Sequence, residues 1–148
     1  GPIGKAIRKH GAGLHLKTAG TTWLEELIGL ACAEGEGLAM AKEIYRNAFG
    51  RIDELCAPYA AIIDIDRKKL PDPGEVDRWD GRKYAETLRH VQSNPAFNLN
   101  FRQLLHVGFK VAADLGERYY RAVADNEEVI AKNVCENLLE RHVKRVFV

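Results

Sequence analysis

The sequence predicts an α/β fold in which helices alternate with parallel strands. Three observations carry this prediction. Short strand-like apolar runs recur between longer helix-like stretches. One of these runs, AAIIDID at residues 60–66, is apolar enough to be buried on both faces, as parallel strands are. Polar residues gather at the carboxyl end of each run, which is where (β/α)8 barrels place their chemistry.

The composition is typical of one soluble globular unit, so residues 1–148 are interpreted as a single domain. The chain is 46% hydrophobic and 29% charged, and its net charge of +1 gives no reason to expect nucleic acid or a membrane surface as a partner. It shows no apolar stretch of membrane-spanning length and no signal peptide, which predicts a cytoplasmic protein. Its 3 cysteines lie far apart and are expected to be free, buried thiols.

The first half of the chain is expected to run helix, strand, helix, helix. A short helix over 3–10 ends at two glycines, and GLHLK at 13–17 follows as a strand. The next helix, over 21–33, begins with a capping box at TTWLE and carries an apolar face at helical spacing. A further helix over 38–59 is ended by Pro58.

The second half is expected to run strand, helix, strand, helix. The run at 60–66 is the second strand, and the helix over 80–94 stops before Pro95. The third strand lies at 103–107, and one or two helices close the chain over 117–148. Three parallel strands leave bare edges, so we expect the chain to form a homo-oligomer or to pair with a complementary barrel chain.

Polar side chains at the three strand ends are the candidate functional residues. His15 and Lys17 end the first strand, Asp64 and Asp66 the second, and His106 the third. In a barrel they would converge on one mouth, where two histidines and a carboxylate can hold zinc, iron or manganese. Plainer interpretations stay open, because a lone histidine is often a hydrogen-bonded structural residue and the two aspartates can cap the loop that follows.

Four stretches resemble segments of the tagaturonate epimerase family, metal-dependent barrel proteins of hexuronate catabolism. They are HLKTAGTTWLEEL at 15–27, EIYRNAF at 43–49, IDIDRKKLP at 63–71 and FRQLLHVGF at 101–109. Members of that family are much longer than this chain. The resemblance therefore implies a (β/α)8 TIM barrel of which this chain forms the last three βα units, the carboxyl-terminal portion.

The resemblance also implies which residues form the site. His15 and His106 match strand-end histidines of the family, so they are the predicted ligands of a divalent cation, which can be Zn, Mn, Fe or Ni. Lys17 and Arg102 match basic residues near its site, and the hydroxyl of Thr18 lies beside a helix amino terminus, which favours anions. The predicted substrate-binding residues are Lys17, Thr18, Arg102 and Asp66.

The implied function is that of a metal-dependent epimerase interconverting tagaturonate and fructuronate, which makes a small sugar acid the expected partner. The family's further carboxylates and histidine are absent from this sequence, so the chain is expected to hold only part of the active site, and its acid and base residues stay unassigned. The alternative is a non-catalytic fragment or assembly module of a barrel enzyme.

Overall fold

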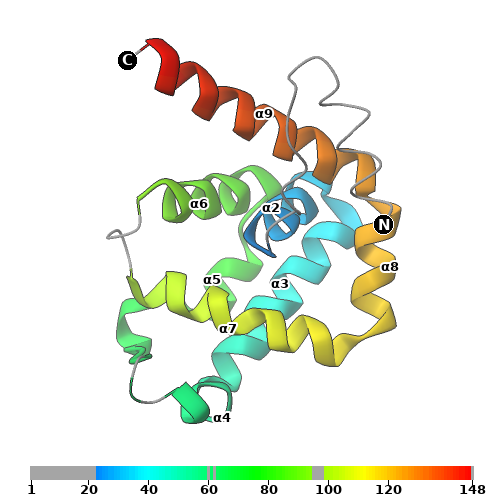
Figure 1. Cartoon of the computed structure of the whole chain (residues 1–148). Coiled ribbons are helices and arrows are strands. Elements are labelled where there is room, and N and C mark those ends of the chain that lie inside the picture. The colour runs from blue at the N-terminus through cyan, green and yellow to red at the C-terminus, as the bar shows by residue number, and fades with distance from the viewer. Residues whose placement is uncertain (1–22, 60, 62, 95–98, 148) are drawn as a thin grey trace.

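The structure, a computed structural model, describes residues 23–59, 61, 63–94 and 99–147. Its central element is α2 (Trp23–Ala33), which other helices cover on several sides (Figure 1). The successive residues Leu27, Ile28, Gly29 and Leu30 of this helix are all buried, although they point in four different directions around its axis. A helix that is apolar all round belongs in the interior, and α2 has that character.

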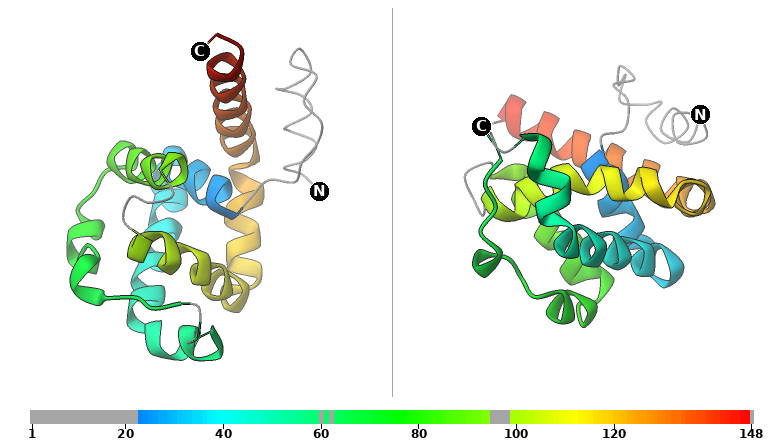
Figure 2. Two further views of the ribbon diagram at one scale, coloured as in Figure 1. Left: turned by 60° about the vertical axis from the view of Figure 1, so that its left-hand side comes forward. Right: turned by 90° about the horizontal axis from the view of Figure 1, so that it is seen from below.

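The remaining helices form a shell around α2 and its neighbour α3. Helices α3, α6 and α9 pack against α2, and α3 in turn contacts α5, α7 and α8 (Figure 2). The elements after α2 are α3 (Gly35–Gly50), α4 (Ile52–Cys56), η2 (Ala57–Tyr59), η3 (Arg67–Lys69), α5 (Pro73–Asp77), α6 (Gly81–Ser93), α7 (Leu99–Leu115), α8 (Glu117–Asp125) and α9 (Glu127–Phe147).

Aspartate caps begin three successive elements of the middle segment. The side chains of Asp66, Asp72 and Asp80 accept hydrogen bonds from backbone N–H groups in the first turns of η3, α5 and α6, at 3.0, 3.1 and 2.7 Å. A helix start leaves backbone donors unpaired, and an aspartate cap satisfies one of them. This segment is therefore a series of capped helices.

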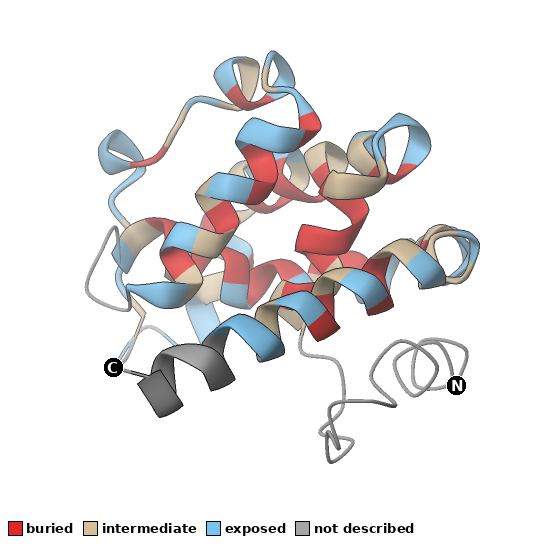
Figure 3. Cartoon of the chain, turned by 90° about the horizontal axis from the view of Figure 1, so that it is seen from above, coloured by how far each residue is buried: buried red, intermediate tan, exposed pale blue. Residues whose placement is uncertain are grey.

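Buried residues from the main helices form one core, and they lie on the parts of the ribbon that face other helices (Figure 3). Two buried tyrosines join the middle segment to α3. Tyr84 donates a hydrogen bond to the carbonyl oxygen of Ala41 at 2.9 Å, and Tyr45 donates one to that of Pro71 at 2.6 Å. Each buried hydroxyl thereby has an acceptor, so the core gains aromatic area without an unsatisfied donor.

The prediction of an α/β fold with a partial (β/α)8 TIM barrel is wrong. Across the residues that the structure describes there is no strand, and hence no sheet or barrel. The expected strand at 103–107 lies inside α7, and residues 63–66 of the expected strand at 60–66 form an irregular segment leading into η3. The physical reason at α7 is its spacing: the buried residues Phe101, Leu104 and Leu105 recur at helical intervals, which continue at Gly108, Val111 and Ala112.

Several helices agree with their predictions. The helix expected at 21–33 ends at Ala33 as predicted, the one at 80–94 is α6, and the closing region forms two helices, α8 and α9. The helix expected at 38–59 is instead divided at Arg51 into α3 and α4, followed by the short η2. The helix at 3–10 and the strand at 13–17 lie outside the described residues.

Two expectations drawn from composition can also be compared with the structure. None of the described helices is long and apolar enough to cross a membrane. All three cysteines are free, as predicted: Cys135 is buried, whereas Cys32 and Cys56 are half-buried.

Helix α9 approaches α2 so closely that the contact requires a glycine. A Cβ atom added to Gly29 would lie 2.7 Å from the Cα atom of Ile130 and would also collide with its side chain. Because the clash involves the backbone of Ile130 and not only its side chain, a change of rotamer cannot relieve it. Gly50, at the end of α3, has no atom near the position of an added Cβ and serves as a matched control.

We expect Gly29→Ala to destabilise the protein by about 1–3 kcal/mol, because overpacking at this contact must push α9 away from α2. Gly50→Ala should stay within about 0.5 kcal/mol of the native protein. Urea unfolding followed by circular dichroism measures both. Equal stabilities for the two variants would show that α2 and α9 do not pack at this distance.

Candidate functional site

The first turn of α2, the end of α6 and the first half of α7 enclose a cavity of about 260 Å³. Its apolar lining comes from Trp23, Leu24, Val91 and Leu105, and its polar lining from Gln92, Arg102 and His106. A mostly apolar pocket with a few converging polar groups is the usual form of a small-molecule site. We call it the α2–α7 cavity.

Two of the residues predicted for the site meet in this cavity. Arg102 and His106 are four residues apart on α7, so they lie on the same side of the helix, and both line the α2–α7 cavity. Arg102 is half-buried and His106 is exposed. The structure therefore brings together a guanidinium group and an imidazole, although on a helix and not at the ends of strands.

One guanidinium nitrogen of Arg102 lacks a hydrogen-bond partner among the described residues. Its Nη1 atom is shielded from solvent and finds no hydrogen-bond acceptor within the described part of the chain. A charged group out of water without a partner costs free energy, and an anion would remove that cost. The planar guanidinium matches a carboxylate with two parallel hydrogen bonds. The Oε1 atom of the adjacent Gln103, which does not line the cavity, is likewise buried without a partner.

A polar network fixes Gln92 at the wall of the cavity. Its Nε2 atom donates to the Oε1 atom of Glu25 at 3.4 Å, and its Oε1 atom accepts from Nδ2 of Asn137 at 3.1 Å. These contacts connect α2, α6 and α9 through one side chain. The amide of Gln92 is thus oriented by its neighbours before any ligand binds.

Trp23 is anchored by two other helices. Its Nε1 atom donates to the carbonyl oxygen of Leu105 at 2.6 Å, and its ring centroid lies 5.7 Å from that of Tyr119. The Tyr119 hydroxyl in turn donates to Oε2 of Glu26 at 2.5 Å. Burial raises the pKa of Glu26 above its ordinary value, and the hydrogen bond from Tyr119 only partly opposes this shift.

Of the other predicted site residues, only Asp66 lies within the described part of the chain, and it does not join Arg102 and His106 in this cavity. His15, Lys17 and Thr18 lie outside the described residues. Asp66 caps η3, while its backbone N–H donates to Oδ1 of Asn100 at 2.8 Å, and it does not line the α2–α7 cavity. One of the alternatives open from the sequence, an aspartate that caps the following loop, is what the structure shows at Asp66.

The described residues alone do not fit a metal site. No group of three histidine, cysteine, aspartate or glutamate side chains within this part of the chain is arranged to hold an ion. His106 is the residue of ligand type that lines the α2–α7 cavity. Protein metal sites with an open position for substrate usually have three protein ligands, so further ligands are required in addition to His106.

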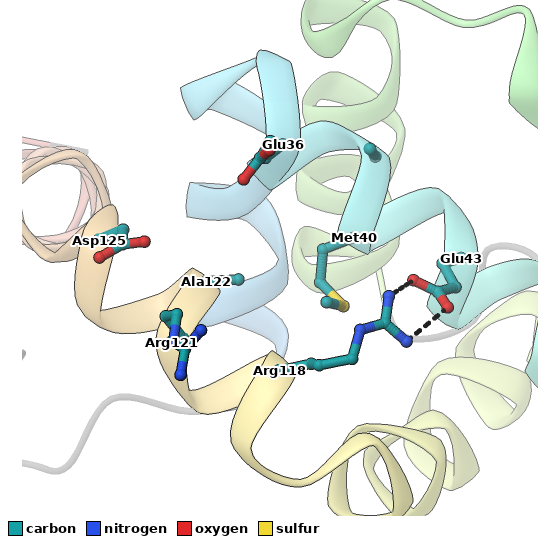
Figure 4. Close-up of a pocket in the computed structure, with 8 residues that line it drawn as sticks. Glu36, Met40, Glu43, Arg118, Arg121, Ala122 and Asp125 are labelled. Carbon is teal, nitrogen blue, oxygen red and sulfur yellow. Dashed lines mark hydrogen bonds and ion pairs between the residues drawn. The ribbon is translucent and has the colours of Figure 1, made fainter.

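A larger hollow of about 390 Å³ lies between α3 and α8, and charged side chains from both helices line it (Figure 4). Arg118 crosses it to Glu43 with hydrogen bonds of 2.8 and 3.2 Å, and Arg121 bonds Glu117 on its own helix at 3.3 Å. Each guanidinium therefore already has a carboxylate. Both arginines of this groove are thus paired, in contrast to the Nη1 atom of Arg102, which has no partner among the described residues.

Sequence reasoning did not identify Trp23 and Gln92 as lining residues. Trp23 packs against Tyr119 as an aromatic residue between helices, and nothing in the sequence marks Gln92. Both contribute to the site only because α2, α6 and α7 converge there, and that convergence is a property of the tertiary fold. The helical spacing of α7 was the available signal, since it would have oriented Arg102 toward a neighbouring helix.

We expect Glu26→Gln to raise the melting temperature at pH 7 by about 2 °C, because ionising the partly buried carboxyl costs stability. The pKa of Glu26 is raised by folding, so this cost is complete above its folded-state value and vanishes as the pH falls below about 4.5. The difference between the variant and the native protein should accordingly shrink toward zero near pH 4. Glu86→Gln, at an exposed surface pair, is the control.

Thermal unfolding at pH 4 to 8 gives this comparison. A Glu26→Gln variant that was less stable than the native protein at pH 7 would show that the bond from Tyr119 outweighs burial.

Comparison with known protein families matches residues 3–146 to the UxaE family, tagaturonate epimerase. No curated protein and no solved structure matches the chain. The match extends across nearly all of the sequence, including the three helices that line the candidate site and the residues at 15–18. The chain belongs to the tagaturonate epimerase family.

Proposed function

We propose that the α2–α7 cavity binds the sugar acid in a metal-dependent interconversion of tagaturonate and fructuronate. The observation that carries the proposal is that Arg102 lines the same cavity as His106, while its shielded Nη1 atom has no hydrogen-bond partner among the described residues. A ketohexuronate supplies the carboxylate that this guanidinium lacks. Membership of the tagaturonate epimerase family supports the same class of substrate.

The chemistry of the reaction explains why a carboxylate anchor is useful. The inverted carbon is β to the ketone, where enolisation does not acidify the C–H bond. Inversion therefore requires either cleavage and re-closure of a carbon–carbon bond or transfer of a hydride out and back. In the cleavage route the inverted carbon becomes an aldehyde that stays attached to the carboxylate. Arg102 would hold that fragment while the aldehyde presents its other face.

The proposal assigns only part of an active site to the described residues. A divalent cation, of Zn, Mn, Fe or Ni type, would be held by His106 together with ligands from outside the described residues, of which His15 is the first candidate. When bound, such a cation acts as a Lewis acid on oxygen atoms of the substrate. Because the described residues do not complete its site, we assign no chemical step to it.

The predicted partner chains and the predicted cellular location are separate from the proposed reaction. A homo-oligomer or a complementary chain was expected because an incomplete sheet has bare edges, and this reason does not apply to the helices described. A homo-oligomer or a complementary barrel chain therefore stays a prediction from the sequence. Light scattering of the intact protein measures its oligomeric state. A cytoplasmic location stays a prediction from the sequence.

Arg102→Ala should raise the Kd for tagaturonate by roughly 10-fold to 100-fold, because a charge-assisted hydrogen bond of about 1.5–3 kcal/mol is lost. The Kd for tagatose, which lacks the carboxylate, should change little. Compared with Arg102→Ala, Arg102→Lys should recover part of the affinity, because the ammonium group keeps the positive charge but cannot form the two parallel hydrogen bonds of a guanidinium. Calorimetry on the intact protein measures each constant.

The matched control is Arg82→Ala, which removes an exposed arginine that pairs with Glu86 on the same helix. It should leave both affinities unchanged. An Arg102→Ala variant that lost affinity for tagatose and tagaturonate equally would contradict a carboxylate anchor at Arg102.

His106→Ala should weaken the binding of Mn²⁺, Ni²⁺ and Zn²⁺ by at least about tenfold, because a site with an open position loses one of its few protein ligands. His90→Ala, which changes a histidine of α6 outside the cavity lining, is the control. The measurement is isothermal calorimetry on the intact protein after chelation and dialysis.

A double-variant cycle tests whether His15 and His106 share one ion. If they do, the loss in the double variant should be smaller than the sum of the losses in the two single variants. Unchanged metal affinity in His106→Ala would overturn the assignment of this histidine as a ligand.

A further inference from the structure

Contacts with two neighbouring helices hold the Trp23 side chain at the wall of the α2–α7 cavity. The bond from its Nε1 atom to Leu105 and the packing of its ring on Tyr119 hold it from α7 and α8. The ring also lies close to Gly108 of α7, where an added Cβ atom would be 3.6 Å from the indole Cζ2 atom, an ordinary van der Waals distance. The indole thus lies against α7 backbone at one edge and still contributes to the cavity wall.

The cavity has two chemically distinct linings that correspond to the two sides of a sugar acid. Arg102, His106 and Gln92 supply charged and hydrogen-bonding groups, which suit the carboxylate and the hydroxyls. Trp23 contributes an aromatic surface among aliphatic neighbours. A sugar acid exposes apolar C–H groups where its hydroxyls do not point, and these groups gain free energy from leaving water for an aromatic ring.

We infer that Trp23 is the platform on which the C–H side of the sugar acid lies, while Arg102 holds its carboxylate. The inference rests on the proposed function and adds a residue that determines how the substrate is positioned. An indole that is already immobilised loses little conformational entropy when a ligand binds. Trp23 therefore contributes affinity that does not depend on the charge of the ligand.

Fluorescence offers a direct observation, because the chain has only 2 tryptophans. Trp79 packs edge-on against Tyr84 with their ring centroids 5.9 Å apart, and it does not line the α2–α7 cavity. In a Trp79→Phe variant, Trp23 is the remaining indole. Tagaturonate should change its emission, and the same titration of Trp23→Phe, which keeps Trp79, should give no change.

Affinity gives the second measurement. Trp23→Leu should raise the Kd by roughly tenfold and Trp23→Phe by roughly threefold, because the aromatic contact area is removed or reduced. The loss should be equal for tagaturonate and tagatose, in contrast to the charge-selective loss in Arg102→Ala. Trp79→Phe is the matched control and should leave both constants unchanged.

The outcomes separate the inference from the proposed function. If the intact protein bound tagaturonate with an Arg102-dependent preference over tagatose, but neither Trp23 variant changed affinity and the Trp23 emission stayed constant, the inference alone would fail. If the intact protein bound neither ligand, the proposed function and this inference would both be overturned. Should Trp23→Leu not fold, the Trp23→Phe affinities and the emission titration still decide the question.

Discussion

The burial of α2 on nearly every side is the constraint on which the rest of the structure depends. Leu27, Leu30 and Ala31 give up all contact with water, and the helix leaves no room at Gly29 for anything larger than hydrogen. A second close approach occurs where the carbonyl oxygen of Ala31 faces Gly81 at the start of α6. Two glycines in two helices therefore set the separations from α9 and α6, and the core excludes water only when both helices lie that close.

This packing also determines where the site is. Because the middle of α2 is enclosed, its first turn is where the helix borders an open space, and Trp23 and Leu24 meet α6 and α7 there. The same contacts that stabilise the core fix the walls: Trp23 bonds to α7, and Gln92 is held between Glu25 and Asn137. A cavity built on packed helices keeps its side chains in place before a ligand arrives, which lowers the entropy lost on binding.

Sequence patterns predicted the helices with strong local signals and failed where a short window was ambiguous. The helix at 21–33 has apolar residues at helical spacing, and α6 begins with an aspartate cap, so both could be predicted from local chemistry. The run at 103–107 contains too few residues to separate a strand from a buried helix. Only the longer spacing from Phe101 to Ala112 shows the helix. The run at 60–66 is β-branched, but no neighbouring strand among the described residues supplies hydrogen-bond partners for it.

The pairing of Arg102 with His106 survived the wrong secondary structure for a geometric reason. Residues four apart lie on the same face of a strand, whose side chains alternate, and also on the same side of an α-helix, where they are one turn apart. A resemblance that identified both residues therefore placed them together under either fold. No such coincidence of geometry applies to Trp23 and Gln92, because they reach the cavity from α2 and α6 and not from α7. Their recruitment depends on how α2 and α6 pack onto α7, and packing between distant segments is what a local pattern leaves undetermined.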